Sequence, residues 1–194
     1  KEYLENPAKA FASEISENLS QLTQYPMSIK LFRIYRDIRF SKDKTPYNTH
    51  IHISFFFSHE NKSNLQHPAF HIGIELDKIF CGCGFFAFNS EQLTQYRQLI
   101  AHSVLGQELD DILKSFESTG YSLADPELKR LPAEFDKTHA HAQLLRRKGL
   151  VLWYTEDFSD AVYQTDFAQL ISTRLISMKP LYDWLLHLEQ NHAI

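Results

Sequence analysis

Cysteine and glycine are scarce in this sequence. Its 194 residues include 2 Cys and 6 Gly. Cys81 and Cys83 are two positions apart, which is poor spacing for an unstrained disulfide, and no second Cys or Cys-His pair completes a zinc site. Both thiols are therefore expected to be reduced and structural. The sequence also lacks a Gly-rich phosphate loop, a nucleophile elbow and a zinc-protease helix, so it does not indicate the enzyme classes that carry them.

Long apolar runs are absent as well. The longest ones are far too short to cross a bilayer. No N-terminal stretch combines the charged start, apolar centre and small-residue cleavage site of a secretion signal. We therefore expect a soluble, cytoplasmic protein with no membrane partner. The formal net charge of −4 gives no reason to expect general binding to nucleic acid.

The residues that are abundant are those of a large core. The chain is 43% hydrophobic and contains 15 Phe and 9 Tyr, and its length suits one domain over residues 1–194. Four strand-like segments follow one another without a helix-length insertion, which favours an antiparallel meander. We predict an α+β fold, a curved and mostly antiparallel sheet of about five strands with helices packed on one face. Strands are predicted at 29–40, 49–58, 70–76, 79–88 and 150–154, and helices at 8–22, 90–116, 139–148 and 166–188, the last kinked or divided at Pro180.

Basic residues cluster in the segment from Lys30 to Lys44, which contains six basic and two acidic residues. Within the predicted strand over 29–40, alternation places Arg33, Arg39 and Asp37 on one face, opposite Phe40. Planar guanidinium groups paired to a carboxylate suit the bidentate capture of carboxylate or phosphate. A positive island on an acidic protein suits a small anion better than a long polyanion.

The same segment resembles a known family. Its pattern resembles the signature of a mainly bacterial family, domain of unknown function 2461. A second region, from Lys129 to Lys148, is similar to the C-terminal half of that family. The resemblance implies no particular activity. It does imply an N-terminal helical segment that this chain lacks, so we expect the chain to be a piece of a longer protein. The signature positions are filled here by Arg33, Arg36, Asp37, Arg39, Phe40, Asp43, Lys44 and Tyr47.

Alternation along the other strands predicts a pocket. His50 and His52 share one face of the second strand, and His71 and Glu75 share one face of the third. If the apolar faces pack on the helices, these side chains meet the arginines on the opposite face. The ligand-binding candidates are Arg33, Arg36, Arg39, Lys44, Lys129 and Arg130, the last two delivered by a coil over 121–136 that lies across the sheet. The catalytic candidates are Asp37, which would orient the arginines, and Tyr47 or His50, one of which would be the proton-transfer group.

Three functions stay open at this point. The leading hypothesis is a protein that binds a small anionic, phosphate-bearing ligand in an arginine-rich pocket, with hydrolase or transferase chemistry if it is an enzyme. The alternative is a non-catalytic module whose arginine face meets an acidic partner or a nucleic-acid end, and the arginines could equally form ordinary ion pairs. The third is a metal-dependent enzyme that uses His50, His52 and Glu75. The sequence assigns no cofactor and no oligomeric state.

Overall fold

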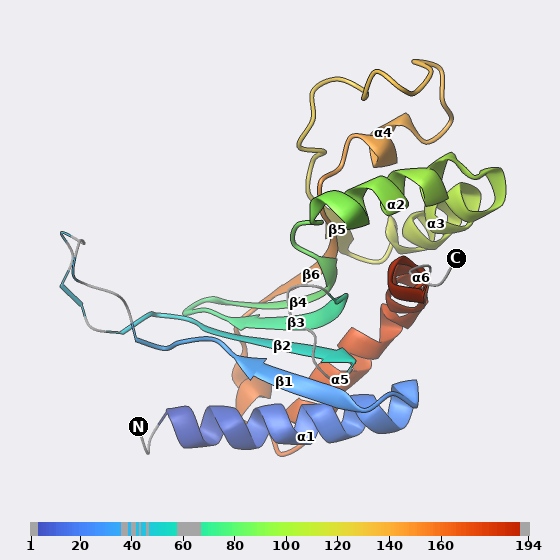
Figure 1. Cartoon of the computed structure of the whole chain (residues 1–194). Helices are drawn as coiled ribbons and strands as arrows, with labels where there is room; N and C mark the ends of the chain where they lie inside the picture. The colour runs from blue at the N-terminus through green and yellow to red at the C-terminus, as the bar shows by residue number, and fades with distance from the viewer. Residues whose placement is uncertain are drawn as a thin grey trace.

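One antiparallel sheet organises the protein (Figure 1). The computed structural model describes residues 4–35, 39, 42, 44–45, 47–57 and 67–190. In this part of the chain six strands lie in the order β1-β2-β3-β4-β6-β5, and all neighbouring strands run antiparallel. The α+β prediction is confirmed, with six strands instead of about five. The strands are β1 (Met27–Leu31), β2 (Ile51–Phe57), β3 (Ala69–Ile74), β4 (Lys78–Phe85), β5 (Tyr121–Leu123) and β6 (Leu150–Asp157).

Helices pack on one face of the sheet and gather at one end of it (Figure 1). α1 packs along β1 and β2, while α5 and α6 pack against β4. The predicted break at Pro180 is confirmed, because α5 stops at Ser177 and the proline occupies the first turn of α6, where its missing N–H is tolerated. Among the described residues, no helix is both long and apolar enough to cross a membrane. The helices are α1 (Glu5–Thr23), α2 (Ser90–Ala101), α3 (Ser103–Phe116), α4 (Ala142–Leu145), the 3-10 helix η2 (Asp160–Tyr163), α5 (Phe167–Ser177) and α6 (Lys179–Gln190).

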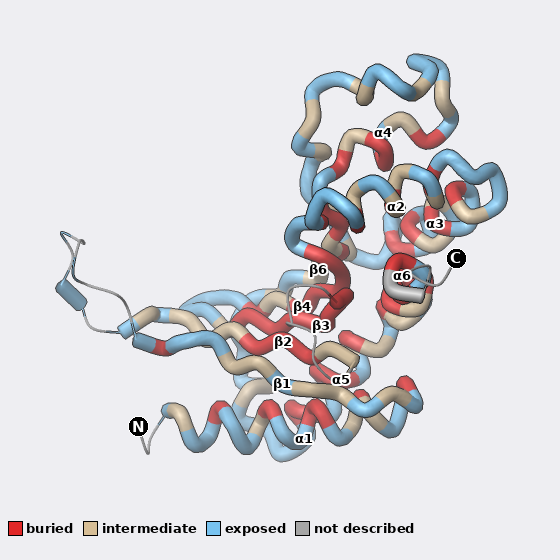
Figure 2. Tube along the Cα trace, viewed as in Figure 1, coloured by how far each residue is buried: buried red, intermediate tan, exposed pale blue. Residues whose placement is uncertain are grey.

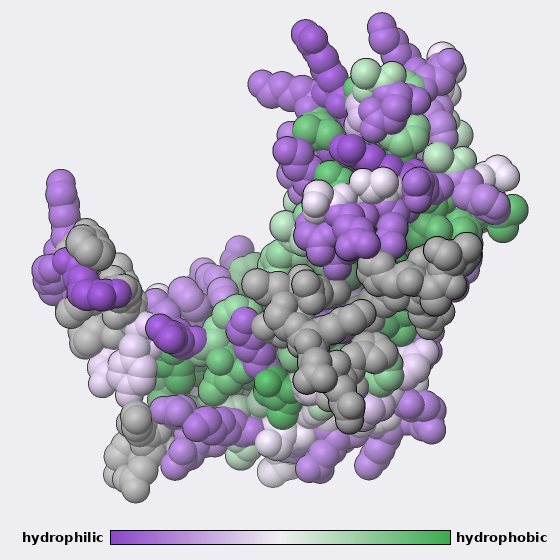
Figure 3. All heavy atoms as spheres, viewed as in Figure 1, coloured by the Kyte–Doolittle hydropathy of each residue, from purple (hydrophilic) through white to green (hydrophobic). Residues whose placement is uncertain are grey.

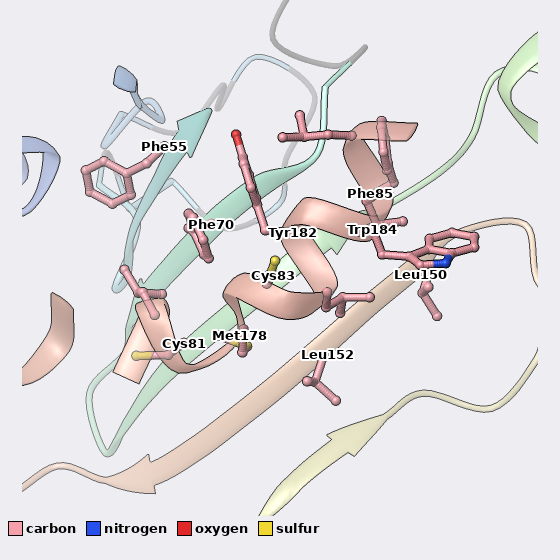
Figure 4. Close-up of a cluster of buried hydrophobic side chains, with 14 of the residues drawn as sticks. Phe55, Phe70, Cys81, Cys83, Phe85, Leu150, Leu152, Met178, Tyr182 and Trp184 are labelled. Carbon is pink, nitrogen blue, oxygen red and sulfur yellow. The ribbon is translucent and has the colours of Figure 1, made fainter. Parts of the chain in front are cut away.

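The core lies between the sheet and α6 (Figures 2 and 4). Tyr182 of α6 stacks on Phe70 of β3 with a ring-centroid distance of 4.5 Å, and its hydroxyl accepts a hydrogen bond of 2.9 Å from the backbone N–H of Phe57. Cys81 and Cys83 are free thiols in this core, as predicted. Burial raises the pKa of Cys81 to about 12, so the thiol stays protonated at neutral pH.

The first strand differs from the predicted one over 29–40, since β1 begins at Met27 and ends at Leu31. Beyond it the chain stays beside β2 irregularly. Phe32 N–H donates to the His52 carbonyl at 2.9 Å, and Tyr35 forms an isolated bridge with Tyr47. Ile34 is buried here, but Phe32, Arg33 and Tyr35 are exposed, so little burial is available to hold a regular strand.

The coil predicted over 121–136 is wrong at its start. Tyr121–Leu123 form β5, which pairs with Tyr154–Leu152 of β6 at the edge of the sheet. The reason is aromatic packing, because the Tyr121 ring lies 5.0 Å from Phe116 and 5.1 Å from Tyr154. The predicted helix over 139–148 is also shorter, with α4 limited to Ala142–Leu145 after a run of turns.

The face of the sheet opposite the core is hollowed. Figure 3 shows a concave outline between the β1–β2 end of the sheet and the lobe that carries α2, α3 and α4. This concave face carries the strand residues that point away from the core, among them Ser54, His71 and Trp153.

Candidate functional site

One row of residues crosses the sheet on the face opposite the core. Its members come one from each strand and lie beside one another in register. Because successive side chains of a strand point to opposite faces, these residues lie on the face opposite core residues such as Phe55 and Phe70. The row therefore forms the floor of the concave face. In sheet order the row is Lys30, Ser54, His71, Gly82, Trp153 and Ser122.

A pocket of about 750 Å³ lies over this row. We call it the sheet pocket. Its lining is mainly aromatic and apolar, with a few polar groups from the floor and the rim. The described side chains and backbone segments that line it belong to Phe32, His52, Ile53, Ser54, His71, Ile72, Gly73, Glu75, Phe80, Phe86, Ser122, Leu123, Ala124, Trp153 and Thr155.

Two glycines shape the floor of the sheet pocket. A Cβ at Gly82 would lie 2.5 Å from the Trp153 ring, and one at Gly73 would lie 3.2 Å from the His52 ring. The two rings therefore lie over backbone that carries no side chain. Phe86 completes the aromatic wall, with its ring 4.4 Å from His71 and 5.8 Å from Trp153, and it is 60% exposed at the rim.

This contact predicts a specific coupling. Gly82→Ala should lower the free energy of unfolding by about 1–3 kcal/mol, because the new methyl group must displace the Trp153 indole. In a Trp153→Val background the ring is gone, so the same substitution should cost less than about 1 kcal/mol. Urea denaturation of the four proteins measures both steps. An equal cost in the two backgrounds would contradict the contact.

A buried hydrogen-bonded chain lies at the centre of the floor. His71 Nδ1 is 2.9 Å from Ser54 Oγ, and His71 Nε2 is 3.3 Å from the carbonyl oxygen of Gly84. Ser54 and His71 are 4% and 7% exposed. Burial, helped by the nearby His52, lowers the pKa of His71 to about 4 despite the opposing hydrogen bond to Gly84. His71 is therefore neutral at physiological pH.

His52 stands between the sheet pocket and a second one. Its ring stacks on that of His50 with centroids 4.4 Å apart. Partial burial lowers the pKa of His52, and the neighbouring His50 acts in the same direction, while Glu75 opposes them. Both imidazoles are half-buried, so they combine flat apolar surface with ring nitrogens that can bind a ligand.

The second pocket, of about 730 Å³, shares Phe32 and His52 with the sheet pocket. We call it the annex. Lys30 Nζ lies 5.0 Å from the centroid of the Phe32 ring, which places the ammonium group beside the junction of the two pockets. The described residues that line the annex carry two fixed positive charges and no carboxylate. They are Lys30, Leu31, Phe32, Arg33, Tyr35, Asn48, His50 and His52.

The described members of the predicted ligand-binding set do not line one pocket. Arg33 lines the annex, whereas Arg39 and Lys44 are exposed and line neither pocket. Arg36 lies outside the described residues. Lys129 and Arg130 are exposed in the segment before α4 and also line neither pocket, so the coil does not deliver them to the floor.

The described members of the predicted catalytic set, Tyr47 and His50, do not line the same pocket. Asp37 lies outside the described residues. Tyr47 is exposed, with its ring 5.2 Å from that of Tyr35, and His50 lines the annex. Glu75 and His52 line the sheet pocket, but the described residues contain no group of three or more His, Cys, Asp or Glu side chains that could hold a metal ion. The metal hypothesis therefore gains no support.

The sequence reasoning assigned no role to Ser54 and Trp153. Ser54 shares the face of His52 by simple alternation, and this signal was present in the sequence. Trp153 stands in an apolar run that reads as buried on both faces, so its position on the concave face depended on the pairing of β6 with Gly82 of β4.

A family model described as "Conserved hypothetical protein (DUF2461)" matches residues 1–184. The match covers nearly the whole chain and agrees with the resemblance seen in the arginine-rich segment. No curated protein matches the sequence.

Proposed function

The chain belongs to the DUF2461 family, whose description names no activity. From the geometry of the two pockets, we propose that the protein binds a small amphiphilic anion. The flat apolar part of this ligand lies in the sheet pocket. Its carboxylate or phosphate group lies in the annex.

The observation that carries the proposal is the junction of two unlike pockets. One is lined mainly by aromatic and apolar residues and the other carries Lys30 and Arg33, and they share Phe32 and His52. A ligand that spans the junction would meet both environments at once. The volume of about 750 Å³ lies within the range of roughly 300–1,000 Å³ found for small-molecule sites.

The aromatic groups support a planar ligand. The rings of Trp153, Phe86 and His71 lie 4.4 to 6.1 Å from one another by centroid. Such groups bind flat rings by stacking and edge contacts. A concave site of this kind favours a small ligand over the alternative of an interaction module, for which a flat exposed patch would be expected.

A panel of planar aromatic acids tests the proposal. We expect 1-naphthylacetate, indole-3-acetate and phenyl phosphate to shift the NMR signal of the Trp153 indole N–H, and we expect 1-naphthaleneethanol, which lacks the charge, to bind about tenfold more weakly than 1-naphthylacetate. The variant Lys30→Ala/Arg33→Ala should remove this preference for the acid. Lys129→Ala/Arg130→Ala is the matched control, since it removes two exposed cations that line neither pocket.

Two outcomes would count against the proposal. If no member of the panel moves the Trp153 signal, the sheet pocket is not a site for such ligands. If the acid and the alcohol bind equally well, the annex does not hold the anionic group.

A further inference from the structure

We propose that the Ser54 hydroxyl accepts a hydrogen bond from the ligand, so that the ligand is an aromatic acid carrying an N–H or O–H donor on its flat part. The inference rests on the proposed function and names the chemical class of the ligand more closely. It follows from the direction of the hydrogen bonds in the buried chain that joins Ser54, His71 and Gly84.

The hydrogen bond between His71 and Gly84 fixes the direction of the whole chain of hydrogen bonds. A backbone carbonyl oxygen can only accept, so His71 Nε2, at 3.3 Å from it, must carry the proton. A neutral imidazole has a single N–H, and burial keeps His71 neutral, with its pKa lowered to about 4. His71 Nδ1 is therefore unprotonated, and it accepts the hydrogen bond of 2.9 Å from the Ser54 hydroxyl.

Ser54 is left with acceptor capacity alone. A serine hydroxyl has one proton and two lone pairs, and the proton is already committed to His71. Both ring nitrogens of His71 are occupied as well. Among the described residues that line the sheet pocket, Ser54 and His71 are the buried polar side chains, since Glu75, Ser122 and Thr155 are exposed. The oxygen of Ser54 is thus the buried polar atom that a ligand would contact. It can form a further hydrogen bond only with a donor group of the ligand.

The strand holds this oxygen in place. Ser54 lies in the interior of β2, opposite Lys30 of β1 and His71 of β3, so its backbone is fixed from both sides. A fixed acceptor discriminates between ligands better than a mobile one, because it cannot turn away from a ligand that lacks the donor.

The same hydrogen bond could be read as a nucleophile beside its base, but the surroundings of His71 argue for recognition. A serine nucleophile needs a base that becomes an imidazolium ion, whereas burial lowers the pKa of His71 to about 4. Its second nitrogen faces a backbone carbonyl instead of a carboxylate that would stabilise the cation. Ser54 is accordingly a binding group here.

A matched pair of acids tests the inference. Indole-3-acetate and 1-benzothiophene-3-acetate have nearly the same shape and the same carboxylate, but only the indole has an N–H. Calorimetric titration of the wild-type protein should give a dissociation constant about 3–10 times lower for the indole. The preference should vanish in Ser54→Ala and persist in Thr155→Ala, which removes an exposed hydroxyl at the same pocket. Equal binding of the two acids to the wild type would overturn the inference while leaving the proposed function intact.

A second measurement does not depend on the stability of any variant. The ¹⁵N chemical shifts of His71 distinguish the two neutral tautomers, and the inference requires the proton on Nε2. If Nδ1 carries the proton, Ser54 accepts from His71 and the argument fails. If neither acid moves the Trp153 signal, it is the proposed function that fails.

Discussion

Replacing Gly84 with alanine is expected to lower the free energy of unfolding by at least about 3 kcal/mol, because two separate costs add up. Gly84 has a φ of 142°, a conformation that residues with a Cβ rarely adopt. A Cβ at this position would also lie 1.9 Å from the carbonyl oxygen of Leu150. That oxygen belongs to the backbone of β6, which cannot withdraw without loss of its pairing with β4. For a chain of this size the expected fall in melting temperature is about 6–12 °C or more.

Gly120→Ala is the matched control for this prediction. Gly120 also has a positive φ, of 82°, but a Cβ there would meet only the side chain of Tyr154, at 3.6 Å. Its substitution should therefore cost only the backbone term, about 1–2 kcal/mol. Thermal or urea denaturation separates the two variants. Equal losses would mean that the contact with Leu150 contributes nothing.

The stability of the protein should fall as the pH drops from about 6.5 to 4, and His71 should account for a large part of this fall. In the unfolded chain the imidazole takes up a proton near pH 6.5, whereas in the folded protein it does so only near its lowered pKa of about 4. Between these values the unfolded state binds more protons, so acid favours unfolding, and the effect levels off below pH 4. The full contribution is roughly 3 kcal/mol.

The contribution of His71 is isolated by comparison with His71→Gln, whose amide can still donate to the Gly84 carbonyl. Wild type and variant are unfolded with urea at several pH values between 7 and 4. As the pH falls, the wild type should lose up to roughly 3 kcal/mol of unfolding free energy relative to the variant, because Gln does not titrate. Parallel curves would show that His71 is protonated equally easily in both states. NMR titration of the His71 ring gives its pKa directly.

Most of the fold could be predicted because its strands and helices carry clear periodic patterns. The alternation of Ile51, Ile53 and Phe55 with polar residues, and the lack of a helix-length insertion between the four predicted strands, were enough to indicate the meander of β1 to β4. Pro180 marked the division between α5 and α6. β5 could not be predicted, since three residues carry too little pattern and their pairing depends on the packing of Tyr121 against Phe116 and Tyr154.

The site was predicted only in part. Alternation correctly indicated that His52, His71 and Glu75 share one face, and the structure places them around one pocket. The arginine motif was extended along a strand that in fact ends at Leu31, so the parity argument no longer applied to Arg33 and Arg39. The pairing of distant strands, which brings Trp153 onto Gly82, is a tertiary property that local spacing does not contain.

The floor of the sheet pocket has a thermodynamic consequence. Its row takes one residue from each strand, from Lys30 at one edge to Ser122 at the other, and its members are far apart in the chain. If any one strand separated from the sheet, the floor would lose the residue that this strand contributes, and the pocket would lose its shape. A ligand held there would be linked to the folding of the entire sheet. Ligand binding would therefore lower the population of partially open states, which are the states that proteases cleave and from which aggregation starts.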